Sequence, residues 1–527
     1  MKIREENAEF ETIPALIDDR AARWGDKLAL TIVDKSLTYR DIALRSASLA
    51  AGLTEQGVAK GDVVATFMHN HEAQVLIWFA CCRIGAIAAP LNVGLQGDDL
   101  RYTLNDVGAE LLIVDSECWE KLEAAVPENI SRSVFSVEPV ADCGHFNELF
   151  SASAPPSVVV QPGDTCCIIY TGGTSGMPKG VALSQFYYIV SAYRWGSAIK
   201  ATSSDHHYSV LQCFHVAAQT NAIVTPILYG YGSTLDRWFS LSRYWSRVRA
   251  CDASIIDPMG SMFTLLVKQP PSPQDRAHRV RVTWGATAML PKHVEEDFVE
   301  RFGIFIVPVY GGTEIGGTAV VHTPLGEIHR KGTNGHPNGW CDLRIVDANE
   351  EPVPVGTVGL ITVRPTVPYS MLNGYHNNPQ RTLDCLVNMW WHTGDLGSVD
   401  EDGWLTFVGR EAHWLRRRSE NISAYEVESI LARYPGIAEV VVVGVPSELG
   451  EDEVKAFIRP ENGVSIDPRE LTKWAEDHMA RFKVPRFVEF VERLPQSAAK
   501  QEIERHKLKQ HGNERAWDRE AADMQKA

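Results

Sequence analysis

The chain has 527 residues, a length that a single hydrophobic core rarely spans, so we expect at least two domains. Hydrophobic residues make up 44% of the chain and charged residues 22%, which is typical of a packed globular protein. The net charge of -16 excludes a general nucleic-acid binder, because such a protein needs excess cations against phosphates.

The N-terminal segment and the apolar runs favour a cytoplasmic protein. Residues 1–14 lack the apolar core of a signal peptide, and Arg83 ends the apolar run that starts at Val75 before it could span a bilayer. We therefore expect no membrane insertion. The cysteines have neither a metal-type C-x-x-C spacing nor the density of a disulfide scaffold, so we expect buried small hydrophobes.

Short apolar runs alternate with helical patterns over the first three quarters of the chain. Thr38 and Asp41 form a capping-box-like start for a helix. Strands are predicted at 63–68, 111–114, 166–170, 208–212 and 304–310. This alternation predicts an α/β fold with a largely parallel, helix-covered sheet.

The pattern changes after Lys331 to short strands and turns. The runs 343–347, 359–365 and 403–410 predict a twisted or barrel-like segment. A small α+β unit follows, with helices predicted at 424–434 and 468–482 and strands at 439–445 and 487–494. We therefore divide the chain into a large N-terminal domain, 1–409, and a small C-terminal domain, 410–527.

The stretch from Tyr170 to Ser184, "YTGGTSGMPKGVALS", is suited to phosphate. Its glycines let backbone N–H groups approach an anion, its hydroxyls add donors, and Lys179 supplies a cation. It is not a Walker A loop, because Lys179 lies between Pro178 and Gly180. The stretch follows a predicted strand, at the sheet edge where open α/β folds bind ligands. An ordinary flexible loop is the alternative interpretation.

Six further motifs follow this loop in a fixed order. They are "CFHVAAQ" from Cys213, "WGATAM" from Trp284, "VYGGTE" from Val309, "WHTGDLG" from Trp391, the pair Gly409-Arg410, and "ENISAYEVE" from Glu420. Together they resemble the adenylate-forming superfamily of acyl-CoA synthetases, firefly luciferase and peptide-synthetase adenylation domains, and are most similar to the carnitine-type acyl-CoA ligases. The resemblance covers nearly the whole chain. It implies that a carboxylate attacks the α-phosphorus of ATP, that pyrophosphate leaves, and that the acyl group of the acyl-AMP passes to coenzyme A.

The resemblance also implies which residues bind the nucleotide and its metal. The β- and γ-phosphates would lie against Thr171, Gly172, Gly173, Thr174, Ser175, Gly176 and Lys179. Tyr310 would stack on adenine, beside Gly311 and Gly312, and Thr313 would touch the α-phosphate. Glu314, with Thr171, would hold Mg²⁺, which prefers oxygen ligands. A solvated turn carboxylate is the alternative interpretation of Glu314.

Other motif residues are implied to bind ribose, the acid and the thiol. Asp395 would accept the ribose hydroxyls, reinforced by Arg410, and the boundary between adenine and acyl group would be lined by Gly285, Ala286 and Thr287. His215 would gate the acyl and thioester tunnel, which is a positioning role rather than base chemistry. The pantetheine channel would run past Ser419, Glu420 and Asn421. Relatives carry glycine at the Ser419 position, so a side chain there would narrow the thiol's route.

The family's adenylation lysine, which bridges carboxylate and α-phosphate, has two candidate registers here. Lys500 is the nearest lysine and is our candidate for the catalytic residue. Aligning back from Ile503 and Arg505 puts Glu502 in that place instead, where a carboxylate would repel the negative reactants. The resemblance also implies a mobile small domain that rotates about residues 409–413, with His413 at the hinge position.

We therefore expect an ATP-dependent ligase that joins a small carboxylic acid to coenzyme A with ATP and Mg²⁺. An amine or a carrier-protein thiol as acceptor is the first alternative, and a nucleotide- or acyl-adenylate-binding protein with weak ligase turnover is the second. Val216, Ala217 and Ala218 leave room for an acyl group. The pocket could admit a branched or ring-bearing acid, because little bulk is added by Gly311, Gly312, Gly316 and Gly317. We expect no nucleic-acid partner, and a homodimer stays open.

Overall fold

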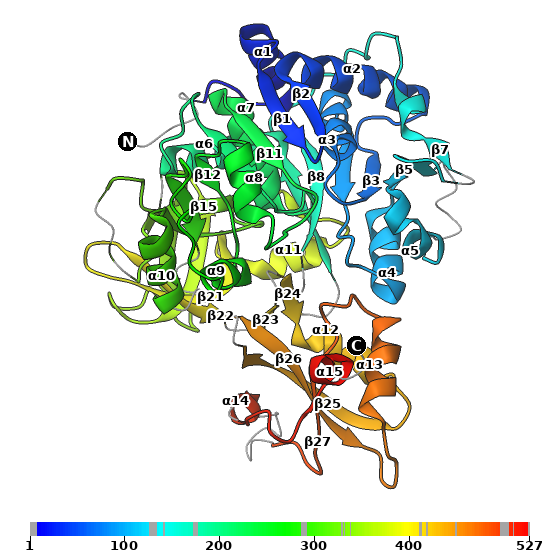
Figure 1. The fold of residues 1–527 in the computed structure, drawn as a ribbon, viewed down its shortest axis with the longest axis vertical. Coiled ribbons are helices and arrows are strands. Elements are labelled where there is room, and N and C mark those ends of the chain that lie inside the picture. The colour runs from blue at the N-terminus through cyan, green and yellow to red at the C-terminus, as the bar shows by residue number, and fades with distance from the viewer. Residues whose placement is uncertain are drawn as a thin grey trace.

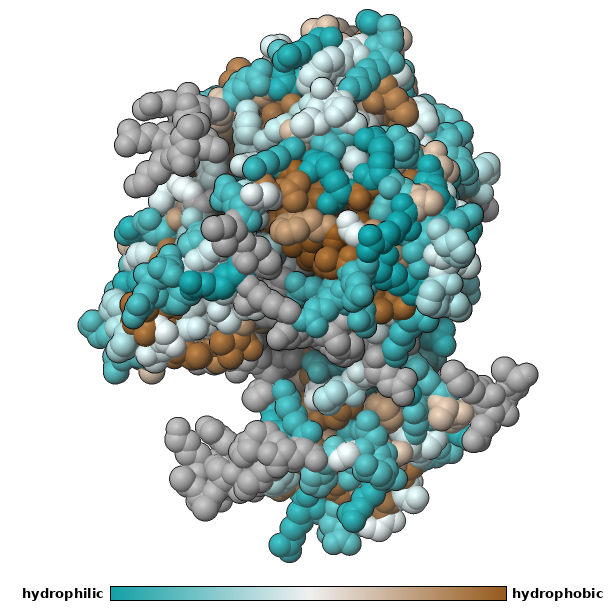
Figure 2. All heavy atoms as spheres, turned by 60° about the vertical axis from the view of Figure 1, so that its left-hand side comes forward, coloured by the Kyte–Doolittle hydropathy of each residue, from teal (hydrophilic) through white to brown (hydrophobic). Residues whose placement is uncertain are grey.

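The protein has a large domain of stacked sheets and helices above a smaller domain, as the computed structural model in Figure 1 shows. The structure describes residues 8–125, 134–140, 143–171, 178–285, 292–327, 330, 332–337, 339–410, 414–417, 420–447, 451–495, 505–509 and 511–524. Within these residues, no helix combines the length and the apolar character that a bilayer crossing needs. Figure 2 shows a mostly hydrophilic face, with apolar residues gathered in the middle of the large domain.

The first large sheet carries the phosphate-like loop. Its eight strands run in the order β19-β9-β8-β4-β3-β5-β6-β7. Their bounds are β3 Val63–Phe67, β4 Ile87–Pro90, β5 Leu111–Val114, β6 Val134–Ser136, β7 Gly144–His145, β8 Thr165–Thr171, β9 Lys179–Ser184 and β19 Gly374–Tyr375. The strands β4, β3, β5, β6 and β7 are parallel, as the sequence predicts.

The strand β9 is one that the sequence analysis did not predict. It pairs antiparallel with β8, with Thr171 opposite Lys179, so the phosphate-like stretch leads from one strand of the sheet to its neighbour. Hydrophobic runs do not reveal the pairing partner of a strand. The hairpin places Thr171 and Lys179 side by side at the base of the loop.

The second large sheet has nine strands, in the order β16-β15-β14-β13-β12-β10-β11-β1-β2. Their bounds are β1 Leu28–Ile32, β2 Lys35–Thr38, β10 His206–Ser209, β11 Gly232–Leu235, β12 Ile255–Ile256, β13 Val282–Gly285, β14 Phe305–Gly312, β15 Gly317–His322 and β16 His336–Pro337. Its centre is parallel and its two ends are antiparallel. The predicted α/β class is therefore confirmed, with mixed sheets.

Buried helices link the two large sheets. The helix α6 (Gln185–Ala198) packs against β9 of the first sheet and β15 of the second. Almost all of its residues are buried, as are those of α3 (Glu72–Ile84), which is typical of helices inside a protein core. The remaining α-helices described in the large domain are α1 Ile13–Trp24, α2 Tyr39–Glu55, α4 Gly97–Val107, α5 Trp119–Glu123, α7 Thr225–Tyr229, α8 Tyr244–Ala250, α9 Ser261–Val267, α10 Lys292–Phe302 and α11 Pro379–Cys385.

Two local predictions for the large domain are confirmed. The Thr38 hydroxyl accepts from the Asp41 N–H at 3.0 Å while the Asp41 carboxylate accepts from the Thr38 N–H at 2.8 Å, which is the predicted capping box at the start of α2. None of the ten cysteines, all of which lie within the described residues, forms a disulfide, and all but Cys143 and Cys251 are buried.

A third sheet, antiparallel, occupies the segment predicted to be barrel-like. Its strands are β17 Cys341–Val346, β18 Gly359–Pro365, β20 Leu386–Val387, β21 Trp390–Val399 and β22 Leu405–Arg410. The predicted domain boundary lies at the end of β22, and the boundary itself stays a prediction. The residues beyond it form the hairpin of β23 (Trp414–Arg417) and β24 (Glu420–Ser423), then a four-stranded sheet.

That four-stranded sheet and its helices complete the small α+β domain. The strands are β25 Ile437–Pro446, β26 Asp452–Pro460, β27 Phe487–Phe490 and β28 Trp517–Asp518, and the helices are α12 Ala424–Leu431, α13 Pro468–Glu476, α14 Arg505–Lys509 and α15 Arg519–Met524. The helix α13 ends six residues before its predicted end. From Asp477 the chain forms a turn that contacts the large domain, so a tertiary contact shortens the helix.

Candidate active site

A cavity of about 1370 Å³ lies where the strand ends of the large domain meet the small domain. It is lined by residues from the phosphate-like stretch and from five of the six further motifs. These include Thr171 and Lys179, Phe214 to Ala217, Trp284, Tyr310 to Ile315, His392 to Asp395, and Glu420. The motifs are far apart in sequence, so the fold brings them to one site.

Glu314 lies at the centre of the polar end of this cavity. The Thr171 hydroxyl donates to Glu314 Oε1 at 3.4 Å, and the Tyr375 hydroxyl donates to the same oxygen at 3.1 Å. Burial and the charge of Glu314 both raise the pKa of Tyr375, so its hydroxyl keeps its proton and remains a donor. The Lys179 ammonium lies 5.5 Å from the centre of the Tyr375 ring. A cation, hydroxyls and a carboxylate therefore converge at the base of the β8–β9 turn.

Tyr310 and Asp395 form the second polar group of the cavity. The Tyr310 hydroxyl donates to Asp395 Oδ2 at 2.9 Å, and Asp395 is only 6% exposed. The Thr393 hydroxyl accepts a hydrogen bond from the Asp395 N–H at 3.1 Å, which fixes the backbone between these two residues. Arg410 lies opposite Asp395 in the pairing of β21 with β22. An aromatic ring and a fixed carboxylate in this arrangement can hold a nucleoside.

The backbone between Tyr310 and Glu314 requires glycine at Gly311. A Cβ there would lie 2.0 Å from the carbonyl oxygen of Gly317, which no packing tolerates. Gly312 has room for a side chain, and Thr313 is held through its carbonyl, which accepts from the Tyr187 hydroxyl at 2.8 Å. The close approach of β14 and β15 therefore aims Tyr310 and Glu314 into one cavity.

Other residues of the cavity wall are apolar. They include Phe214, Val216, Met259, Met262, Trp284 and Ile315. The Trp284 ring meets the buried Trp195 ring edge to face, with centroids 6.4 Å apart. Gly285, predicted to line this boundary, ends β13 next to β14, but the described wall is formed by its neighbour Trp284.

His215 connects the cavity to the small domain. Its Nε2 lies 3.5 Å from Glu420 Oε1 in β24, and the Asn92 amide donates to the same oxygen at 3.3 Å. Burial alone would raise the pKa of Glu420, but His215 and Asn92 stabilise its carboxylate and lower that pKa. Glu420 is the family-motif residue of the small domain that the structure places in the cavity.

The segments that flank Lys500 lie elsewhere. Leu494 and Leu508 pack with Val441 and Phe457 on the sheet of the small domain. In Figure 1, α14 lies at the lower end of this domain, whereas β23 and β24 lie next to the large domain. The described pose therefore presents the β23–β24 hairpin to the cavity.

Several predicted site residues lie outside the described residues. These are Gly172, Gly173, Thr174, Ser175, Gly176, Ala286, Thr287, His413, Ser419, Lys500 and Glu502. Arg410 and Asn421 are placed by their strands, β22 and β24, through the backbone only.

Sequence reasoning missed Tyr375 and the role of Trp284. Tyr375 follows Gly374 in a short segment without periodicity, so nothing in its neighbourhood marked it as a partner of Glu314. Trp284 is the first residue of the motif "WGATAM". Its large apolar side chain could have identified it as a wall residue of the acid site.

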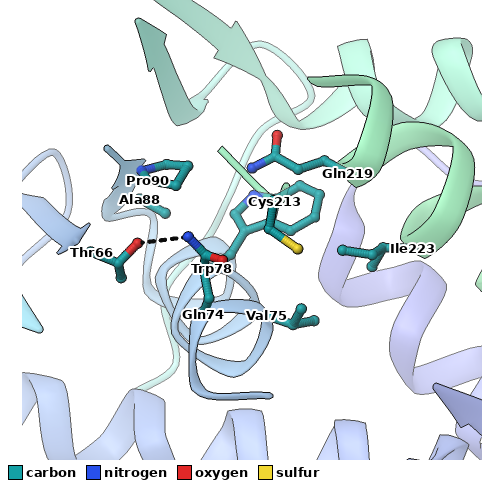
Figure 3. Close-up of a pocket in the computed structure, with 9 residues that line it drawn as sticks. All are labelled: Thr66, Gln74, Val75, Trp78, Ala88, Pro90, Cys213, Gln219 and Ile223. Carbon is teal, nitrogen blue, oxygen red and sulfur yellow. Dashed lines mark hydrogen bonds between the residues drawn. The ribbon is translucent and has the colours of Figure 1, made fainter. Parts of the chain in front are cut away.

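Two other polar features near the cavity have separate explanations. His69, Asp115 and Cys118 are spaced as metal ligands, but Arg237 Nη2 lies 3.3 Å from His69 Nδ1 and supplies the positive charge there. Figure 3 shows the residues around a second, small pocket, where Gln74 donates to Thr66 at 3.3 Å. Its volume is about 10 Å³. That space is the size of one water molecule.

The family assignment follows from the comparisons with known proteins. Residues 17–376 match the AMP-binding enzyme family, and residues 426–500 match the AMP-binding enzyme C-terminal domain. The chain belongs to the AMP-binding enzyme family. The predicted recognition, the ligase class and the general function of an adenylate-forming ligase are thereby confirmed.

Individual relatives of this AMP-binding enzyme cover almost its whole length. A crotonobetaine/carnitine–CoA ligase from Salmonella heidelberg (strain SL476) is 29% identical over 500 residues, 92% of this chain and 96% of that protein. An o-succinylbenzoate CoA synthetase from Bacillus subtilis has a TM-score of 0.82 at 24% identity, covering 94% of this chain and 98% of its own. An amide bond synthetase from Marinactinospora thermotolerans has a TM-score of 0.82 at 22% identity, covering 94% and 99%. The two structures share the fold of this chain.

The first prediction concerns the Tyr310–Asp395 hydrogen bond. Tyr310→Phe keeps the ring but removes the donor to a buried carboxylate, so the KM for ATP should rise about tenfold in acid-dependent pyrophosphate exchange. Tyr208→Phe is the matched control, because the Tyr208 hydroxyl donates to Asp236 at 2.8 Å outside the described cavity wall. An equal KM for ATP in both variants would contradict a nucleoside-binding role.

Proposed function

We propose that this enzyme converts a carboxylic acid to its coenzyme A thioester through an acyl-AMP, with ATP and Mg²⁺. The observation that carries the proposal is the single cavity, which joins a cation-and-carboxylate end, an apolar end and the Glu420 hairpin of the small domain. The cation-and-carboxylate part suits the nucleotide, and the apolar part suits the acid. Because both belong to one cavity, the acyl group can stay in place while the leaving group and the acceptor change.

The residues of the polar end fit a magnesium-bound triphosphate. Glu314 offers a carboxylate oxygen, which Mg²⁺ prefers, and Thr171 and Tyr375 fix its orientation by hydrogen bonds. Lys179 adds positive charge at the base of the turn. When bound, the metal would neutralise phosphate charge and so favour approach of the acid.

The chain's own residues would position the first half-reaction. Tyr310 and Asp395 hold the nucleoside, and the backbone at Thr313 lies between them and Glu314. The acid's carboxylate oxygen then forms a bond to the α-phosphorus as the bond to pyrophosphate breaks. Lys179 stabilises the charge that develops on the departing phosphates.

The apolar end favours an uncharged, branched or ring-bearing acid. Trp284, Phe214 and Val216 present rings and methyl groups to the cavity. Burying a charged substituent among these side chains without a partner would be costly. This enzyme therefore differs in expected substrate from the curated relative whose name includes carnitine.

The experiment that tests the function is an acid panel with ATP and Mg²⁺. We expect pyrophosphate release with benzoate-like or branched acids, and thioester formation when coenzyme A is added. A carboxylate labelled with a heavy oxygen isotope should deliver one labelled oxygen to AMP, because that oxygen attacks the α-phosphorus. Unlabelled AMP would contradict the acyl-AMP route, and product formation with an amine but not with coenzyme A would favour the alternative acceptor.

Lys500 is proposed as the adenylation lysine, and this generates a second prediction. Lys500→Ala should slow pyrophosphate exchange by about a hundredfold, because charge stabilisation is lost, while thioester formation from supplied acyl-AMP continues. Glu502→Gln is the control for the alternative register. A Lys500→Ala variant as active as the parent would contradict the assignment. Cytoplasmic location and a homodimer stay predictions from the sequence.

A further inference from the structure

The start of α4 contacts the small domain. Gln96 donates its side-chain amide to the carbonyls of Glu476 and Met479, the latter at 2.7 Å. Asp98 pairs with Arg433 at 2.7 Å, and Asp99 accepts from the Ala480 N–H at 3.3 Å. The turn that ends α13 therefore lies directly on the first turn of α4.

Gly97 lets the two backbones touch. Its φ of +55° is in the left-handed region, and a Cβ there would lie 2.3 Å from the carbonyl oxygen of Asp477. The atom in the way is backbone, which cannot turn aside like the end of a flexible side chain. Any larger residue at this position would push the small domain away.

Asp99 provides the buried charge of the contact. Its Oδ2 lies 3.0 Å from the Lys483 ammonium, and both side chains are almost fully buried. Lys483 also pairs with Glu426 of its own domain. Burial and the charge of Asp99 raise the pKa of Glu426 to about 7.

This arrangement suits a contact that forms and breaks. If the small domain leaves, Lys483 keeps Glu426 as its partner, so separation does not leave an unpaired buried ammonium. Docking adds Asp99 as a third charge together with the backbone contacts at Gln96 and Gly97. Lys483 therefore has a carboxylate partner both when the two domains are docked and when they are apart.

The docked pose also determines what reaches the active site. The neighbouring residue Asn92 donates to Glu420, which places the β23–β24 hairpin beside His215. The segments that flank Lys500 pack on the small-domain sheet, away from this hairpin. We propose that Gln96–Asp99 is a docking site that positions the small domain for acyl transfer to the acceptor, with Gly97 and Asp99 as the positioning residues.

This inference rests on the proposed two-step function, and a pair of glycine variants tests it. Gly97→Ala should slow acyl transfer from supplied acyl-AMP to coenzyme A by about tenfold or more, because the hairpin is displaced. Acid-dependent pyrophosphate exchange should stay close to the parent value. Gly108→Ala is the matched control, since Gly108 ends the same helix with φ of +58° and has no atom within 4 Å of its would-be Cβ. Both variants carry the backbone strain, and only the first carries the clash.

A cross-linking readout measures docking without catalysis. The substitutions Asp98→Cys and Arg433→Cys together place one cysteine on each side of the contact. A bismaleimide should join these cysteines efficiently in a chain with no further change and in one that also carries Gly108→Ala. Cross-linking should be poor in a chain that also carries Gly97→Ala. Equal cross-linking in all three would overturn the docking site, even if no acid in the panel is a substrate. Unchanged acyl transfer in Gly97→Ala, or an equal loss of both half-reactions, would overturn the positioning role.

Discussion

The hydrogen bonds of Thr171 and Tyr375 to one oxygen of Glu314 fix the ends of three separate segments at one point. Thr171 ends β8 of the first sheet, Glu314 follows β14 of the second, and Tyr375 ends β19 beside β9. A carboxylate that accepts two hydroxyls is held in orientation before any ligand arrives, which lowers the reorganisation needed when charge develops. The nucleotide end of the cavity and the base of the β8–β9 turn both depend on this contact.

From that fixed end the cavity extends in two directions that differ in rigidity. The acid side is built from buried strand ends and rings, such as Trp284 against Trp195, so it offers a constant shape to the acyl group. The acceptor side is completed by the small domain, whose contact with α4 uses polar groups and a glycine rather than a large apolar surface. Polar contacts of this kind are typical of interfaces between domains that move. A rigid wall on the large domain can hold the acyl group through both steps. A wall on the small domain can move between them, when the leaving group changes from pyrophosphate to AMP.

The sequence predicted the residues whose signal is local. Thr171, Tyr310 and Asp395 stand in ordered motifs, so their presence in one cavity could be predicted, although their distances could not. The antiparallel return of β9 was not predictable, because a hydrophobic run fits a parallel or an antiparallel partner equally well. The contact of Asp99 with Lys483 joins residues 384 positions apart, and neither side chain belongs to a local pattern. Long-range pairing of this kind is decided by packing, which the sequence pattern alone does not contain.

The magnesium dependence of pyrophosphate exchange in Glu314→Gln tests the central claim most directly. Glutamine keeps an oxygen for Thr171 and Tyr375 to donate to, but it removes the negative charge that would hold the metal. We predict that the magnesium concentration for half-maximal exchange rises by about tenfold or more and that the maximal rate falls, since one carboxylate ligand is lost. An exchange rate and a magnesium requirement equal to those of the parent would contradict the account.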